Sequence, residues 1–331
     1  MTQVLEPPAS PEAPAPLVGG PRPPGAVADR AFRVVAFAAG VLVLAVLGLI
    51  IYATLKNSWD WFSAEGLSGI LSTTWAPSQG EYGAGGLLIM TLIVGTVALV
   101  LAVPVSVGIA LFVNEIAPRR MRLPIVFVID LLAAIPSVVY GLWAFAALRQ
   151  PLADVYSSIS SATSGIPLVK ELTADPSPTG LSFMTAGIIV AIMITPIITS
   201  LTREVFATTP EPLKEAAYGL GSTRWEMIRG SVFPHSRGGV VSAVMIGLGR
   251  AIGETIAVAL LIGSSQTISA HLFGPGDTLA SIIANQFGEA TGEYRAALIG
   301  MGVILLVLTV GVGMLARGVV TRYDKKMGVS G

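Results

Sequence analysis

The chain is a series of long uncharged stretches separated by short polar segments. A helix crosses the roughly 30 Å hydrocarbon core of a bilayer with about 20 mostly apolar residues. Helices are expected because the bilayer core offers no water to unpaired backbone groups, and the ten-residue alternation of barrel strands does not occur in this sequence. Six stretches are long enough to span: 34–55, 86–114, 123–148, 181–202, 238–263 and 296–316. The pattern therefore predicts an all-α membrane protein with six transmembrane helices.

Composition agrees with this prediction and excludes several kinds of function. Hydrophobic residues make up 53% of the chain and charged residues only 12%, whereas about a quarter of a soluble domain is charged. The net charge of zero argues against a strongly basic nucleic-acid binder. With no Cys and two His, the sequence offers neither thiol catalysis nor an evident metal site.

Positive charges predict how the spans are oriented. The segments on the side of the two termini hold fifteen Lys and Arg residues, and the opposite loops hold four. Because basic residues are retained on the cytoplasmic side, we expect a multi-pass protein with both termini in the cytoplasm.

The two ends of the chain are expected to lie outside the membrane domain. Residues 1–30 are rich in proline and show no apolar periodicity, which is typical of a disordered cytoplasmic tail. The six-span domain is expected over 31–325, and 326–331 form a short cytoplasmic tail. The first apolar stretch is long enough to span, so we expect no cleavage of a leader.

The loop 207–237, between the fourth and fifth spans, predicts two short helices. Thr209 is a suitable N-cap before Pro210, and Gly219 and Gly221 are expected to end the first helix.

The second helix of this loop has its own boundary signals. Thr223 and Glu226 have the spacing of a capping box, and Pro234 is expected to close the helix. Two short helices at a sharp turn would form a rigid elbow on the cytoplasmic face.

This loop resembles the EAA loop of ABC-transporter permeases. The resemblance rests on Glu215, Ala216 and Ala217, followed at the family's spacing by Gly221 and Pro234. It implies the ABC importer permease fold, with a coupling loop that docks on an ATPase subunit. An ordinary capped amphipathic linker is the alternative interpretation.

The chain has no phosphate-binding loop of its own, because none of its lysines follows a glycine. ATP-driven transport would therefore use a separate ATPase polypeptide. We expect no cofactor and no enzymatic activity in this chain.

Charges inside the fifth span are candidates for a solute pathway. Arg250 falls about 18 Å along that span, near the bilayer midplane, and Glu254 follows one turn later. Burying an arginine there is costly, so we expect it to face an aqueous path, where its guanidinium would bind a tetrahedral oxyanion and pair with Glu254. A structural ion pair between helices is the alternative. In the third span, Ser137 follows Pro136, and either a kink or a pathway role is expected there.

Three segments extend the resemblance to the PstC-type permeases of the phosphate import system: 131–141, 215–226 and 247–255. The resemblance covers 31–325 and implies phosphate import across a prokaryotic plasma membrane. It also implies a PstA-type permease partner, a pair of PstB-type ATPases and a PstS-type phosphate-binding protein. An ion-gradient-driven secondary anion transporter and a sulfate or molybdate permease of the same ABC class are the alternatives.

Overall fold

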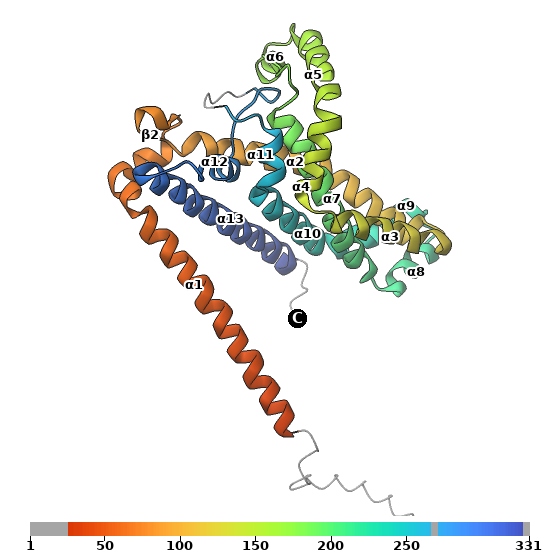
Figure 1. The fold of residues 1–331 in the computed structure, drawn as a ribbon. Helices are drawn as coiled ribbons and strands as arrows, with labels where there is room; N and C mark the ends of the chain where they lie inside the picture. Colours follow the sequence, from red (N-terminus) through yellow and green to blue (C-terminus); the bar gives the residue numbers. More distant parts are fainter. Residues whose placement is uncertain (1–25, 266–270, 327–331) are drawn as a thin grey trace, which may run out of the picture. The chain divides into compact units, whose positions relative to one another are not determined.

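The computed structural model describes residues 26–265 and 271–326, which are almost entirely helical (Figure 1). The chain divides into two units, Met1–Ala53 and Thr54–Gly331. Helix α1 (Ala26–Leu71) contributes to both units. It begins at Ala26, so residues 26–30, expected in the tail, are helical instead, because the last proline of the tail is Pro24. The rest of the expected N-terminal tail and residues 327–331 of the C-terminal one lie outside the described residues.

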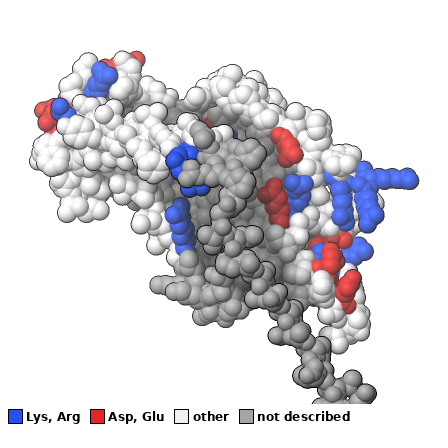
Figure 2. All heavy atoms as spheres, turned by 90° about the horizontal axis from the view of Figure 1, so that it is seen from below, with Lys and Arg blue, Asp and Glu red and all other residues white. Residues whose placement is uncertain are grey.

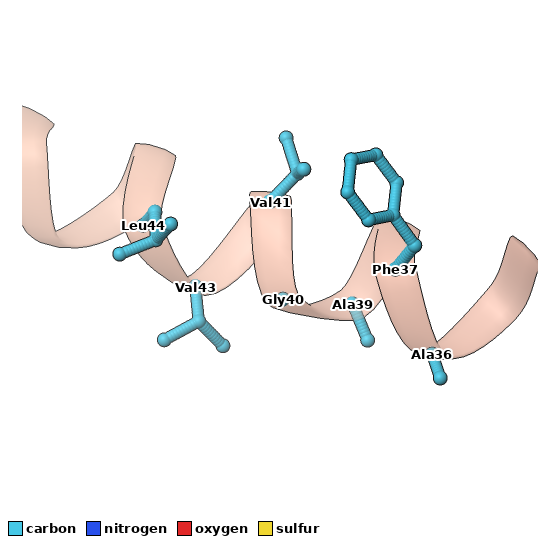
Figure 3. A pocket seen from close by; sticks show the side chains of 7 residues that line it. All are labelled: Ala36, Phe37, Ala39, Gly40, Val41, Val43 and Leu44. Atoms are coloured by element: carbon cyan, nitrogen blue, oxygen red, sulfur yellow. The ribbon is translucent and has the colours of Figure 1, made fainter. Parts of the chain in front are cut away.

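In the smaller unit, α1 is apolar on every side from Val34 onward. Its membrane-spanning window is wholly unburied within the structure. A shallow hollow is lined by seven residues whose side chains point away from the helix (Figure 3): Ala36, Phe37, Ala39, Gly40, Val41, Val43 and Leu44. With only aliphatic and aromatic groups, this hollow suits lipid or an apolar protein surface and cannot hold a charged solute.

The larger unit begins with the last part of α1, which breaks at Gly66 (φ 55°), and continues through a short hairpin into the other helices. The hairpin strands are antiparallel, with Trp75 opposite Tyr82. The hairpin elements are β1 (Trp75–Ala76), the 3-10 turn η1 (Pro77–Gln79) and β2 (Glu81–Tyr82).

The helices in the first half of the larger unit are α2 (Gly85–Leu111), α3 (Arg119–Ala134), α4 (Ser137–Trp143), α5 (Arg149–Thr163), α6 (Pro167–Thr173) and α7 (Phe183–Ala207). Those of its second half are α8 (Glu211–Gly219), α9 (Arg224–Met227), α10 (Phe233–Gly253), α11 (Ile256–Leu261), α12 (Leu279–Gln286) and α13 (Gly292–Lys326). Three π-helical turns join helices: η2 (Phe112–Ile116), η3 (Ala144–Leu148) and η4 (Ile228–Val232).

The structure confirms a helical membrane protein but not the expected count of six spans. Among the described residues, four helices are long and apolar enough to cross a membrane, and a bent pair formed by α3 and α4–α5 makes up to five. The expected fifth span, 238–263, is divided instead into α10 and α11. It does not qualify as a single apolar helix because it is broken and because α10 carries His, Arg, Ser and many Gly residues.

Small residues allow the helices of the bundle to pack closely. Helices α2 and α7 lie along each other, and Gly187 of α7 leaves room for Val97 of α2. Helix α10 packs on α7 through Gly247, which lies against Ile198. Glycine at such positions lets helix backbones approach, as is common in membrane proteins. Figure 1 shows α5 and α6 projecting from one end of this bundle, and α8 and α9 at another.

Candidate functional site

The fifth expected span is broken at Glu254. Helix α10 ends at Gly253, and Glu254 has an extended backbone (φ −67°, ψ 121°) before α11 begins at Ile256. The Glu254 carboxylate accepts a hydrogen bond from the backbone N–H of Ala257 at 3.3 Å. The side chain of Glu254 therefore satisfies a free donor in the first turn of α11.

The expected pairing of Arg250 with Glu254 is wrong. Among the described residues, no ion pair joins these two side chains. The prediction assumed one continuous helix with a spacing of four residues, and the break removes that geometry. Arg250 lies on the last turn of α10 and is exposed, while Glu254 is half-buried.

Arg250 belongs to a face of α10 that the chain itself does not cover. Ile246, Arg250 and Gly253 are exposed, and they follow one another at helical spacing. Gly247 and Ala251, on the opposite side, are buried in the bundle. A charged residue on an uncovered face of a membrane helix requires water or another protein as its neighbour.

A second break separates α3 from α4, where the two helices meet at 89°. Pro136 stands just before α4, in an extended conformation (φ −60°, ψ 142°), and Ser137 is its first residue. The hydroxyl of Tyr140 donates to the carbonyl of Leu132 at 2.9 Å across the bend. The Ser137 hydroxyl has no hydrogen bond to the described part of the chain, and Tyr140 is the side chain that reaches back over the bend.

The two breaks lie at the same level of the bundle. Helices α4 and α11 pack so closely that a methyl group on Gly141 would lie 3.1 Å from the Cα atom of Ala257. Further along each segment, Arg149 at the start of α5 lies against Gly180, and Gly263 just after α11 lies against Leu181 of the same loop. They therefore run in the same direction, and this places the start of α4 beside the start of α11.

Each helix break precedes the contact between Gly141 and Ala257 by about one helical turn. Ser137 precedes Gly141 by four residues, and Glu254 precedes Ala257 by three. Broken helices that meet inside a membrane are the usual setting of solute sites in transporters, because they bring unpaired backbone groups into the bundle.

A third polar contact joins α3 to α7. Asp130 is exposed, and its carboxylate accepts a hydrogen bond from the hydroxyl of Ser200 on α7 at 3.3 Å. The contact joins α3 to the central α2–α7 pair.

The loop between α7 and α10 forms the expected elbow of two short helices, α8 and α9. Thr223 and Glu226 form the capping box, with the backbone N–H of Glu226 donating to the Thr223 hydroxyl at 3.3 Å and the backbone N–H of Thr223 donating to the Glu226 carboxylate at 2.8 Å. The backbone N–H of Thr223, and then its hydroxyl, donate to the Glu226 carboxylate and lower the pKa of this group below its usual value. Gly221 has the left-handed backbone (φ 83°) that turns the chain between the helices.

Two boundary predictions for the elbow are wrong. Pro210, and not Thr209, occupies the N-cap of α8, and the Thr209 hydroxyl is turned toward Ser236 at 3.4 Å. Pro234 does not end a helix but lies in the first turn of α10. The backbone stays helical from α9 through the wide π turn η4 into α10, and this wider turn just before Pro234 accommodates the proline ring, which would crowd the preceding turn of a regular α-helix.

The outer surface of the elbow carries the EAA residues and several large apolar side chains. Glu215 and Ala216 are exposed, while Ala217 is half-buried against the bundle. Four large side chains of the elbow are also exposed: Leu213, Tyr218, Leu220 and Trp225. Leu220 is 89% exposed, and clusters of this kind mark protein–protein contact surfaces.

The inner surface of the elbow is attached to the bundle. Buried Met227, Ile228 and Val232 pack in one cluster with Ala110 of α2 and Phe206 of α7. Lys214 of α8 forms an ion pair with Glu115 of the π turn η2, with 2.9 Å between Nζ and Oε1. Sequence reasoning missed Glu115 because 99 residues separate it from Lys214, and no local pattern marks the contact.

Charged side chains gather at the end of the molecule that carries α8, α9 and the start of α3, as Figure 2 shows. This end includes exposed Arg119, Arg120 and Arg122 on α3, together with Arg224 and Arg229 next to the elbow. Surface charge beside the elbow therefore accompanies the apolar contact surface.

In the ranges that the structure describes, no group of three or more His, Cys, Asp or Glu side chains could hold a metal ion.

Solved structures share this architecture. A bacterial alginate ABC transporter, in complex with an alginate pentasaccharide-bound periplasmic protein, matches with a TM-score of 0.60 at 14% identity over 93% of this chain and 99% of that one. A second structure, of a bacterial ABC transporter involved in the import of alginate, matches with a TM-score of 0.51 at 18% identity, over 83% of this chain and 96% of that one. At these identities the likeness concerns the fold alone.

Sequence relatives are much more similar and extend over nearly the whole chain. The phosphate transport system permease protein PstC of Mesorhizobium japonicum is 41% identical over 92% of this chain and 93% of its own length. The protein of the same name from Xylella fastidiosa is 42% identical over 91% of this chain and 93% of its own. PstC 2 of Mycobacterium tuberculosis is 39% identical over 88% of this chain and 91% of its own.

Residues 102–329, which include both helix breaks and the elbow, match the family described as "Binding-protein-dependent transport system inner membrane component". The chain is therefore a multi-pass membrane permease that belongs to this family and, by its identity over most of its length, to the PstC permeases within it.

Proposed function

We propose that this chain is one permease subunit of an ATP-driven importer that moves inorganic phosphate into the cell. The observation that carries the proposal is the elbow: an exposed apolar surface with the EAA residues, fixed rigidly to the ends of the membrane helices. Phosphate as the solute is supported by relatives named phosphate transport system permease at about 40% identity.

The partners follow from the incomplete surfaces of this chain. An ATPase of the PstB type would seat on the elbow, where Leu220 and Trp225 are the largest exposed apolar groups. A PstA-type permease would cover the exposed face of α10 that bears Arg250 and complete the passage. A PstS-type binding protein would deliver phosphate at the outer side. In this scheme both termini and the elbow face the cytoplasm, and the bacterial sources of the relatives support a prokaryotic plasma membrane as the location.

In this proposal Arg250 binds the passing anion. Its guanidinium presents a planar set of donors that suits a tetrahedral oxyanion, and the uncovered face of α10 gives it access to the passage. Glu254 does not pair with Arg250; it maintains the break by capping the first turn of α11. Ser137 stands beside this break with a free hydroxyl in the described structure and would contribute a hydrogen bond to the solute.

The chain itself makes and breaks no covalent bond in this scheme and needs no cofactor. ATP is used by the partner subunits, whose closing would displace the elbow and switch the opening of the passage from one side to the other. A secondary transporter driven by an ion gradient would have no use for an exposed docking elbow. Competition between the anions for uptake distinguishes phosphate transport from sulfate or molybdate transport by the same fold.

The test uses the complex purified in mild detergent and reconstituted in vesicles. We expect an ATPase to co-purify, uptake of radioactive phosphate to require ATP, and excess sulfate to leave this uptake unchanged. Arg250→Leu should abolish uptake while assembly persists, and Arg250→Lys should retain part of it. Uptake that follows an ion gradient without ATP, or normal uptake by Arg250→Leu, would refute the proposal.

A further inference from the structure

The ion pair between Lys214 and Glu115 is unusual because it is buried under a surface loop. Its side chains are 12% and 8% exposed, whereas Glu211, which approaches Lys214 at 3.6 Å, is 75% exposed. Removing two charges from water is costly, so a buried pair is weak evidence for stability and more often fixes one particular arrangement. Here the arrangement that it fixes is the position of α8 relative to the end of α2.

The turn that holds Glu115 also holds the central helix α7. Asn114, the preceding residue, donates from its amide nitrogen to the backbone carbonyl of Arg203 at 2.6 Å. Asn114 and Glu115 both belong to η2. Its π geometry adds one residue to the turn and so changes the directions in which neighbouring side chains point. A single turn therefore connects the elbow, α2 and α7.

Helices α2 and α7 form the most extensive helix contact of the described structure. Any displacement of their shared end is therefore passed along the length of both helices, because packed interiors move as units and do not deform continuously. The apolar contacts of the elbow with Ala110 and Phe206 reach the same place.

We propose that Lys214 and Glu115 are positioning residues for energy coupling, whose ion pair transmits the displacement of the elbow to the α2–α7 pair. The inference rests on the proposed function, since it needs an ATPase seated on the elbow. When the pair is broken, the ATPase still binds and hydrolyses ATP, but less of its movement reaches the membrane helices.

The decisive measurement is the number of phosphate ions imported for each ATP hydrolysed by the reconstituted complex. We expect Lys214→Met and Glu115→Gln to lower this ratio at least about fivefold, in the range of ordinary coupling energies, with ATP hydrolysis retained. Glu211→Gln removes the exposed partner of the same lysine and is the matched control, with an unchanged ratio. The double reversal Lys214→Glu with Glu115→Lys should restore most of the ratio, because the charges still attract.

A second experiment uses the absence of native cysteine from the chain. Glu115→Cys and Lys214→Cys in one chain can be joined by a short bifunctional thiol reagent. The double-cysteine variant lacks the ion pair and should show the lowered ratio of phosphate to ATP. Joining the two cysteines should raise this ratio again if the elbow and α2 move together, whereas an unchanged ratio or a further loss of transport on joining would overturn the inference.

The outcomes separate the two proposals. Failure of any ATPase to bind the unmodified chain refutes the proposed function itself. An ATPase that binds and hydrolyses, together with an unchanged ratio in both single variants or a double reversal that assembles without restoring the ratio, refutes only the role of the ion pair.

Discussion

Asp277 is a buried carboxyl group in the loop between α11 and α12, outside the membrane-spanning helices. It is 4% exposed and accepts hydrogen bonds from Ser264 at 2.8 Å and from Ser281 at 2.9 Å. Burial raises its pKa from 3.8 to about 6, and the hydrogen bonds from Ser264, Ser281 and Asn285 only partly oppose this shift. Ser264 has a left-handed backbone (φ 39°), so the Asp277 contact holds a strained turn in place.

This shift makes the folded chain more stable in mild acid. The folded state binds the proton more tightly than the unfolded state, so the free energy of unfolding rises as the pH falls through about 6. The rise levels off below pH 3.8, the pKa of this carboxyl group in the unfolded chain. With these two pKa values, linkage gives a gain of about 1.4 kcal/mol between about pH 7.5 and about pH 5. For a chain of this size the gain corresponds to a rise of about 2 °C in unfolding temperature.

The substitution Asp277→Asn removes the titrating group with little change of shape. Thermal unfolding of the detergent-solubilised protein, measured at a series of pH values, should show the acid-side gain in the unmodified chain and its absence in Asp277→Asn. Asp154→Asn, which removes an exposed carboxyl group of α5, is the control and should follow the unmodified chain.

The comparison depends on the difference between the two pH profiles and not on either profile alone, because other groups titrate in the same range. A difference between the unmodified chain and Asp277→Asn that stays constant across this range would refute the reasoning. So would a difference of the opposite sign, in which the unmodified chain loses stability in acid relative to the variant.

Three further predictions concern the breaks and the elbow. Gly141→Ala should destabilise the protein by about 1–3 kcal/mol and reduce phosphate uptake, because its methyl group meets the backbone of Ala257. Thermal unfolding and uptake measure the two effects, and an unchanged protein would show that α4 and α11 do not pack this closely. Gly221→Ala should lower the free energy of unfolding by about 1–2 kcal/mol through its left-handed backbone alone, since nothing lies near the added methyl group. ATPase co-purification should fall with the stability, and equal stability of the two chains would contradict the turn geometry. Trp225→Ala should weaken ATPase binding without lowering the unfolding temperature, because this side chain is exposed, and titration of the purified permease with the ATPase checks it; undiminished affinity would place the contact elsewhere.

Local signals in the sequence predicted the features that depend on neighbouring residues. The apolar stretches predicted a helical membrane protein, since the bilayer imposes both length and hydrogen bonding on each segment. The capping box of Thr223 and Glu226 was predicted from spacing alone, because both partners lie within one turn. The turn at Gly221 was predicted for the same reason.

The sequence was less informative where several conformations satisfy the same local signals. Pro234 can either end a helix or lie in the first turn of the next one, and packing of the elbow on the bundle decided for the second. Arg250 and Glu254 have the spacing of a helical pair, but the tertiary structure broke the helix between them and engaged Glu254 with the backbone of α11.

Contacts between distant segments could not be predicted at all from one sequence. Glu115 and Lys214 are 99 residues apart, and only the packing of α2, α7 and α8 brings them together. The meeting of the two helix breaks likewise depends on the close approach of Gly141 to Ala257. The sequence by itself determined that this chain crosses a membrane as helices and presents a capped elbow, because those properties arise within single segments; the tertiary structure alone decided where the helices break together and how the elbow is attached, because these properties arise only when segments pack.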